Sequence, residues 1–192
     1  MIHTCNYEFD TDEEYKTIFS NYSFELSNFQ KHAIKNIRDG KHVLITAHTG
    51  SGKTLPAEYA IDHFHKKGKK VVYTAPIKAL SNQKFYEFTK QFPHISFGLL
   101  TGDIKTNPEA DVLIMTTEIL RNTLFQKKLV EEQKTNIPLN FDMDIDNDLG
   151  CVVFDEIHYI NDADRGKIWE ETIMMLPKHV QMLMLSATLD KQ

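Results

Sequence analysis

The sequence predicts an α/β fold with a mainly parallel central sheet and helices on both of its faces. Short apolar runs rich in Val, Ile and Leu carry no polar alternation, which is typical of strands buried on both faces. These runs alternate with longer segments of helical periodicity, as expected when helices connect parallel strands. The 192 residues are 41% hydrophobic and 26% charged, an ordinary composition for a globular domain with its own core.

Each element follows from this alternation. The expected strands are the apolar runs, at residues 42–47, 71–75, 96–100, 112–116, 151–155 and 181–185. The expected helices lie between them, at residues 53–66, 78–92, 118–128 and 166–176. In the first of these helices, Leu55, Tyr59 and Phe64 supply the apolar positions.

Two segments stand outside the pattern. Residues 1–22 are predicted to form an N-terminal arm, either mobile or folded as a single amphipathic helix, ahead of one domain over residues 23–192. Residues 127–149 form an acidic connection that is long for a loop between a helix and a strand.

Alternating acidic residues in this connection raise the possibility of a calcium loop: Asp142, Asp144, Asp146 and Asp148. An EF-hand loop beginning at Asp142 needs Gly at its sixth position and Glu at its twelfth, where Asn147 and Val153 stand. A solvated acidic loop is therefore favoured. It could include a short edge strand with three apolar side chains on one side: Phe141, Met143 and Ile145.

Charge and cysteine content exclude several classes of protein. With 22 basic and 27 acidic residues, the net charge of −5 argues against coating nucleic acid by bulk positive charge. Cys5 and Cys151 are too few for a disulfide framework. No apolar run approaches the ~20 residues that cross a bilayer, and the first residues lack a signal-peptide pattern. We expect a soluble intracellular protein.

The run AHTGSGKT at residues 47–54 follows an expected strand and opens an expected helix. In a phosphate loop of this kind, glycines let backbone N–H groups surround a phosphate, Lys reaches the outer phosphates, and Ser or Thr holds Mg²⁺. Ala47 stands where the strict pattern has Gly. The run predicts nucleotide binding through Thr49, Gly50, Ser51, Gly52, Lys53 and Thr54.

Asp155 and Glu156 stand at the carboxyl end of a buried strand, where open α/β sheets bind their ligands. An Asp in this place can hold Mg²⁺ through water. Glu156 is a candidate base for the attacking water. Adjacent carboxylates are costly unless a cation shares them, which favours a metal-assisted site.

These motifs together resemble a known family. AHTGSGKT, DEIH at 155–158 and Ser186-Ala187-Thr188 resemble the first RecA-like domain, a P-loop NTPase fold, of a superfamily-two DExH-box helicase. TAPIKALSNQK, LLTGD, TTEILRN and the run that follows DEIH are similar to the superkiller-type RNA helicases associated with the RNA exosome. The resemblance covers residues 24–189, with Gly50-Ser51 where the family usually has Ser-Ala.

The resemblance implies roles at the nucleotide. Gln30 would read adenine and Phe24 would pack on the base. Lys53, Asp155 and Glu156 would be catalytic, with Mg²⁺ held by Thr54 and, through water, by Asp155. Four residues would couple the nucleotide to the nucleic acid: His158, Ser186, Ala187 and Thr188.

The resemblance also implies contacts to the sugar-phosphate backbone of a single strand, by Pro76, Lys78, Asn82, Gln83, Thr101, Gly102, Asp103, Thr117 and Glu118. The three segments that carry these residues each follow an expected strand, so we expect them at one edge of the sheet. Amides, hydroxyls and a few lysines there can grip phosphates without reading bases.

The expected function is that of the first motor domain of an ATP-dependent RNA helicase, with ATP and Mg²⁺ as cofactors. Its partners would be single-stranded RNA, a second RecA-like domain of the same longer chain, and the RNA-decay machinery. A trans-acting arginine is worth about 10³–10⁵ in rate, so the 192-residue chain should be monomeric and nearly inactive alone. The alternatives are a DNA helicase or translocase, a non-catalytic nucleotide-gated binding module, and a small-molecule kinase.

Overall fold

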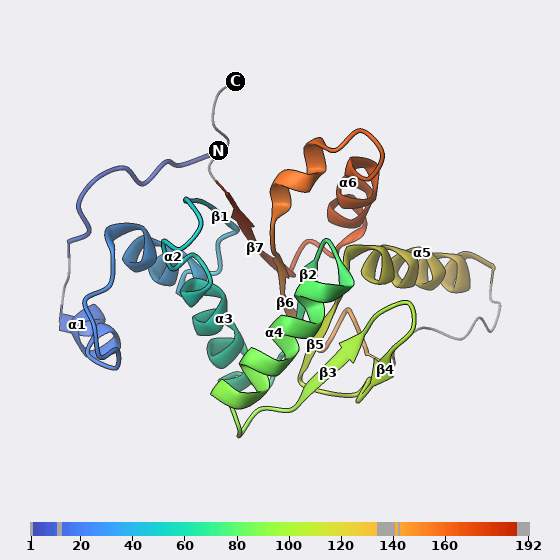
Figure 1. Cartoon of the computed structure of the whole chain (residues 1–192), viewed down its shortest axis with the longest axis horizontal. Helices are drawn as coiled ribbons and strands as arrows, with labels where there is room; N and C mark the ends of the chain where they lie inside the picture. The colour runs from blue at the N-terminus through green and yellow to red at the C-terminus, as the bar shows by residue number, and fades with distance from the viewer. Residues whose placement is uncertain (1, 11–12, 134–140, 142, 188–192) are drawn as a thin grey trace.

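The computed structural model describes residues 2–10, 13–133, 141 and 143–187. Within these residues the strands form one seven-stranded sheet of order β1-β7-β6-β2-β5-β3-β4 (Figure 1). Adjacent strands are parallel, except that β4 runs antiparallel to β3. The strands are β1 (Val43–Thr46), β2 (Lys70–Ala75), β3 (Phe97–Leu100), β4 (Lys105–Thr106), β5 (Val112–Thr116), β6 (Leu149–Phe154) and β7 (Gln181–Ser186). The predicted α/β class is confirmed.

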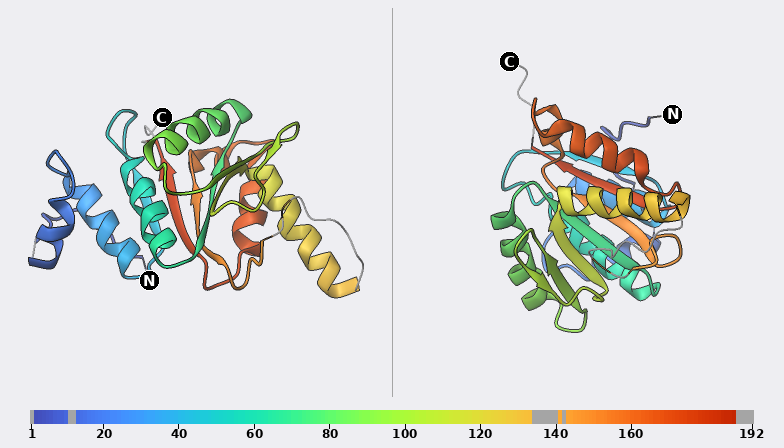
Figure 2. Two further views of the ribbon diagram at one scale, coloured as in Figure 1. Left: turned by 90° about the horizontal axis from the view of Figure 1, so that it is seen from below. Right: turned by 90° about the vertical axis from the view of Figure 1, so that its right-hand side faces the viewer.

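Helices cover both faces of the sheet (Figure 2). The described helices are α1 (Glu13–Phe19), α2 (Asn28–Arg38), α3 (Leu55–Lys66), α4 (Lys78–Gln91), α5 (Thr117–Gln133), the 3₁₀ helix η1 (Ile157–Asn161) and α6 (Gly166–Met175). Side chains of α2, α3 and α4 share one core cluster, which includes Val71 and Tyr73 of β2. Those of α5 and α6 share the other, which includes Val72. Successive strand residues therefore fill opposite layers, as a sheet buried on both faces requires.

The predicted strands and helices are present, with ends that differ by a few residues. The largest difference is α5, which continues to Gln133 rather than ending at Lys128. The helix α2 was not predicted, although Ser27 and Gln30 form a capping box at its start and Ala33, Ile34 and Ile37 form its buried face. The strand β4 is only two residues long, too short to show a periodic pattern.

The acidic connection differs from the expected edge strand. Phe141, Met143 and Ile145 are buried in the core beside α5 and β6, as their shared side predicted. The backbone there forms a turn, because the Asp144 carboxylate accepts hydrogen bonds from the N–H groups of Asp146 and Asn147, both at 3.1 Å. The edge strand was therefore a wrong prediction. Asp142, the first residue of the candidate calcium loop, lies outside the described residues.

The segment before residue 23 contains a helix, α1, and this helix is packed rather than isolated. Tyr15 is buried, and the Phe9 ring lies edge-on to Tyr15 and Phe19 at 5.4 and 5.5 Å. The Asn28 side chain joins this segment to α2, since it accepts from the Phe9 N–H and donates to the Tyr7 carbonyl, both at 2.7 Å. The division of the chain at residue 22 stays a prediction.

We expect Gly166→Ala to lower the free energy of unfolding by about 1–3 kcal/mol, the usual cost of overpacking. Gly166 begins α6, and a Cβ atom there would lie 2.1 Å from the Ile160 carbonyl oxygen of η1. Chemical denaturation measures this change. The control is Lys167→Ala at the next, exposed position, where about 0.5 kcal/mol or less is expected. Equal effects of the two substitutions would contradict the close approach of η1 and α6.

Candidate functional site

The phosphate loop connects β1 to α3 at the carboxyl end of β1. Gly50 and Gly52 have φ angles of +83° and +81°, which glycine adopts without the strain that other residues incur. Thr54 is the N-cap of α3, so the first N–H groups of this helix face the loop. Thr49, Gly50 and Gly52 are exposed, and Ser51 and Thr54 are partly buried. The loop therefore offers backbone donors and a helix N-terminus to an anion.

The Lys53 side chain is buried in this loop. Its exposed fraction is 8%, and among the described residues its Nζ has no hydrogen-bond partner. The nearest charge is Glu156, whose Oε1 lies 3.4 Å from Nζ, an ion-pair distance. The Ser51 hydroxyl oxygen is likewise buried without a described partner. A buried ammonium and hydroxyl with donors to spare fit the phosphates of a nucleotide.

Asp155, at the end of β6, is held by hydrogen bonds to both carboxylate oxygens. The Tyr73 hydroxyl donates to Oδ2 at 2.7 Å and the Glu156 N–H donates to Oδ1 at 3.0 Å. Burial raises the pKa of Asp155 above its ordinary value, while the bond from Tyr73 lowers it. Burial, followed by the Asp155 charge, holds the pKa of Tyr73 well above its ordinary value, so the phenol stays a donor.

Tyr73 is a site residue that the sequence patterns did not predict. It lies within the apolar run of β2, where it reads as an ordinary buried aromatic residue. Only the pairing of β2 with β6 brings its hydroxyl to Asp155.

Glu156 has a left-handed backbone, with φ 51° and ψ 45°. Such a conformation is unusual for a residue other than glycine, and residues held in this way are often functional. Its carboxylate lies between Lys53 Nζ at 3.4 Å and His158 Nδ1 at 3.2 Å. The structure thus brings three predicted site residues into one chain of contacts.

The residues at this edge also fit Mg²⁺. Magnesium sites in ATPases use one or two carboxylates together with substrate phosphates and water. Asp155 supplies the carboxylate and Thr54 the hydroxyl oxygen. No group of three or more His, Cys, Asp or Glu among the described residues could hold a metal ion without such help.

Gln30 links α2 to the phosphate loop. Its side chain is 5% exposed, donates to the Gly52 carbonyl at 3.0 Å and accepts from the Ser27 N–H at 2.9 Å. Both ends of the amide are therefore engaged within the protein. Phe24 is 55% exposed. The roles of both residues toward adenine stay predictions.

The three predicted nucleic-acid segments lie at one edge, because β2, β5 and β3 are parallel neighbours. Lys78 Nζ lies 2.8 Å from Asp103 Oδ1, which also accepts from the Thr101 hydroxyl at 2.9 Å. The hydrogen bond from Lys78 lowers the pKa of Asp103. These contacts join the segment after β2 to the segment after β3, where Gly102 is exposed.

Other residues of this edge differ in what they offer a ligand. Asn82 Oδ1 and Thr117 Oγ1 are buried, with no hydrogen-bond partner among the described residues. Gln83 instead donates to Glu87 at 2.6 Å. Glu118 pairs with Arg165, whose guanidinium also donates to the Pro76 carbonyl.

The segment at 186–188 lies beside the phosphate loop. The Ser186 carbonyl accepts from the Ala47 N–H at 3.2 Å, and the Ser186 hydroxyl donates to the Ala187 carbonyl at 2.9 Å. Thr188 lies outside the described residues.

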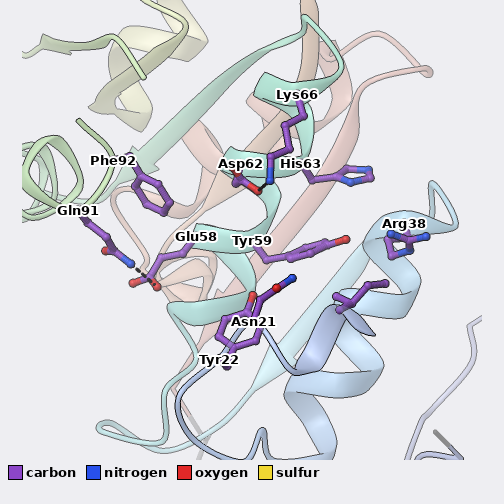
Figure 3. A pocket seen from close by; sticks show the side chains of 11 residues that line it. Asn21, Tyr22, Arg38, Glu58, Tyr59, Asp62, His63, Lys66, Gln91 and Phe92 are labelled. Carbon is purple, nitrogen blue, oxygen red and sulfur yellow. Dashed lines mark hydrogen bonds and ion pairs between the residues drawn. The ribbon is translucent and has the colours of Figure 1, made fainter. Parts of the chain in front are cut away.

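A separate cavity of about 510 Å³ lies along α3 (Figure 3). Its lining includes Tyr22, Arg38, Glu58, Tyr59, His63 and Phe92. None of the predicted site residues lines it. His63 stacks on Tyr59, with ring centroids 5.6 Å apart, and its Nε2 has no hydrogen-bond partner among the described residues.

A phosphate loop and a buried acidic strand end, both on a parallel sheet, define a P-loop nucleotide-binding domain of the RecA-like class. Residues 27–192 match the DEAD/DEAH box helicase family. The chain belongs to that family.

Similar curated proteins include superkiller and exosome helicases. The chain is 48% identical over 167 residues to the antiviral helicase SKI2 of Saccharomyces cerevisiae, 87% of this chain and 12% of that protein. It is 47% identical over 167 residues to human superkiller complex protein 2, again 87% and 12%. It is 44% identical over 168 residues to the mouse exosome RNA helicase MTR4, 88% and 14%. The chain thus spans a small part of each relative.

A similar solved structure is the Mycobacterium smegmatis helicase Lhr bound to single-stranded DNA and AMP-PNP. It has a TM-score of 0.63 and 27% identity, and the alignment covers 92% of this chain and 24% of that one. The DUF1998 helicase MrfA, at 18% identity and a TM-score of 0.65 over 94% and 26%, supports the fold alone. Within the described residues, no helix is both long and apolar enough to span a bilayer.

We expect Tyr73→Phe to lower the free energy of unfolding by about 1–3 kcal/mol, because a buried acceptor loses its donor. The substitution removes the hydroxyl that donates to Asp155 and keeps the ring. Denaturant titration measures the loss. Tyr86→Phe, on an exposed ring of α4, is the matched control and should change little. A Tyr73→Phe protein as stable as this control would show that the hydrogen bond contributes nothing.

We expect the fold to lose stability as the pH falls from about 6.5 toward 4. Burial, with smaller contributions from Lys67 and Arg38, lowers the pKa of His63 from 6.5 to about 4. In this window the unfolded chain binds a proton at His63 that the folded chain does not, so acid favours unfolding. Thermal melts across the window should show a smaller loss for His63→Gln than for the exposed-site control His179→Gln. Parallel profiles would contradict this assignment.

Proposed function

We propose that this chain is the first motor domain of an ATP-dependent RNA helicase, which binds and hydrolyses Mg-ATP to move on and unwind RNA. The observation that carries the proposal is the buried Lys53 ammonium, 3.4 Å from Glu156 and without a hydrogen-bond partner among the described residues. An outer phosphate of ATP would give this ammonium its missing acceptors.

The chain's own residues would divide the work as follows. The amides of Gly50, Ser51 and Gly52 would bind the phosphates, and Thr54 and Asp155 would hold Mg²⁺. The metal would supply positive charge against the charge that develops on the phosphoryl oxygens. Tyr73 keeps Asp155 oriented. Glu156 would orient the attacking water and accept its proton, with His158 against the same carboxylate.

RNA is the favoured polynucleotide because the relatives include proteins named as RNA helicases, among them exosome MTR4. DNA is the second candidate, because the solved neighbour Lhr is bound to single-stranded DNA. The exposed face after β2, β5 and β3 would contact the sugar-phosphate backbone in either case. Similarity to a superkiller complex protein also makes the RNA-decay machinery a proposed partner.

A second RecA-like domain is part of the proposal. The chain spans 12% of the length of yeast SKI2, and a motor of this class closes its ATP site with arginines of a facing domain. Because such an arginine is worth about 10³–10⁵ in rate, we propose slow hydrolysis by these residues alone.

Nucleotide binding and turnover test the proposal. A fluorescent ATP analogue with Mg²⁺ should bind, and Lys53→Ala should weaken binding about 10- to 100-fold, the usual effect of losing a charged hydrogen-bond partner. The control is Lys67→Ala, at an exposed lysine after α3, which should bind normally. Unchanged binding in Lys53→Ala would overturn the nucleotide site.

Turnover separates the remaining alternatives. In the longer protein, Glu156→Gln should keep nucleotide affinity and lose hydrolysis, and single-stranded RNA should stimulate wild-type turnover more than DNA does. Unchanged hydrolysis in Glu156→Gln would favour the non-catalytic binding module. Stimulation by DNA alone would favour the DNA translocase.

A further inference from the structure

Arg165 joins three functional segments of the chain. It stands at the N-cap of α6, in the segment that follows Asp155 and Glu156. Its Nη2 donates to the Pro76 carbonyl, just after β2, and to Glu118 Oε1 at 3.0 Å, at the start of α5. Its guanidinium carbon also lies 5.6 Å from the centre of the Tyr159 ring in η1. One side chain thus connects the loops that follow β6, β2 and β5.

These contacts suit a fixed position better than a free cation. The Asp162 carboxylate accepts from the Arg165 N–H at 2.9 Å, which anchors the backbone. The side chain is 33% exposed and that of Glu118 is 37% exposed. A planar guanidinium can serve a carbonyl, a carboxylate and a ring together, which a lysine cannot.

Glu118 has a different role from the one that the family resemblance implies. A free carboxylate on a surface that contacts phosphates would repel them. Here its charge is matched by Arg165. The neighbouring Thr117 hydroxyl is buried and has no described hydrogen-bond partner, so it remains available for a ligand.

We propose that Arg165 and Glu118 form a positioning bridge, which fixes the nucleic-acid edge relative to the segment that carries Asp155 and Glu156. The inference rests on the proposed function, because the edge matters only if it binds a polynucleotide. The bridge holds the Pro76 and Thr117 segments at one spacing. Neither of its residues contacts the phosphates.

A second ion pair between the same helices provides a matched control. Arg121 of α5 donates to Glu171 of α6 at 2.8 Å through Nε, and both side chains are about one-third exposed, at 33% and 31%. This pair joins α5 and α6 without contacting the loop after β2 among its recorded partners. Breaking it tests the general effect of loosening these two helices.

The test measures binding of a fluorescein-labelled single-stranded polyuridine oligonucleotide by anisotropy. The variants are Arg165→Ala, Arg165→Lys, Glu118→Gln, the Arg165→Ala/Glu118→Gln double variant, and Arg121→Ala. ATP-analogue affinity and thermal stability are measured on the same samples. Glu118→Gln is decisive, because it removes a negative charge and would strengthen RNA binding if Glu118 were only a neighbour of the phosphates.

The bridge predicts a coupled loss. Arg165→Ala and Glu118→Gln should each weaken RNA binding about tenfold, and the double variant should be no weaker than the weaker single one, since both break one interaction. Arg165→Lys should lie between wild type and Arg165→Ala. Arg121→Ala should bind RNA normally, and nucleotide affinity should stay within about twofold in every variant.

Three outcomes would overturn the bridge while the proposed function stands. They are RNA binding as tight or tighter in Glu118→Gln, an equal loss in Arg121→Ala, and a shallower salt dependence in Arg165→Ala. The last would mean a direct phosphate contact, because each one lost lowers the slope by about 0.7 for a single strand. Absence of RNA binding in the wild type would overturn both proposals.

Discussion

Parallel pairing of the strands is the constraint on which the whole candidate site depends. Because β1, β7, β6, β2, β5 and β3 all run in one direction, the loops after them meet at a single edge. β1 and β6 are separated by β7, so their ends are about 9.5 Å apart. The length of the Lys53 side chain and the left-handed backbone of Glu156 together reduce this gap to 3.4 Å.

Buried charge at this edge is tolerated because each ion has a partner. Asp155 is 6% exposed and would be costly to ionise there, but the Tyr73 hydroxyl and the Glu156 N–H both donate to it. Lys53 is 8% exposed and faces Glu156. Spare donors around Lys53 and adjacent carboxylates are complementary to a phosphate with its cation, so the site is arranged for both before either binds.

The sequence predicted those parts of the site that are encoded locally. The phosphate loop and the acidic strand end are short motifs directly after apolar runs, so a strand–loop–helix order was enough to place Lys53 and Asp155. Tyr73 and Arg165 could not be found in this way. Tyr73 meets Asp155 across 82 residues, and Arg165 meets Pro76 and Glu118 across 89 and 47 residues. Such contacts follow from strand order, which the sequence pattern leaves open.

Secondary structure shows the same division. Buried strands announced themselves by composition, whereas β4 is defined only by its pairing with β3. The capping box of α2 was present in the sequence and was overlooked because FELSNFQ was interpreted through its family motif. Phe141, Met143 and Ile145 were correctly placed on one side, but local hydrogen bonds to Asp144 produce a turn where alternation suggested a strand.

Pairing of charges also explains how a chain of net charge −5 can present a surface to a polynucleotide. Both carboxylates that the resemblance placed on the nucleic-acid edge are matched within the protein, Glu118 by Arg165 and Asp103 by Lys78. The two pairs differ in consequence. Lys78 and Asp103 are 55% and 65% exposed, and such surface pairs contribute little, so a phosphate could replace Asp103 at Lys78 at small cost. Arg165 is held by a carbonyl, a carboxylate and a ring at once, so it stays with its partners while Lys78 remains free to exchange.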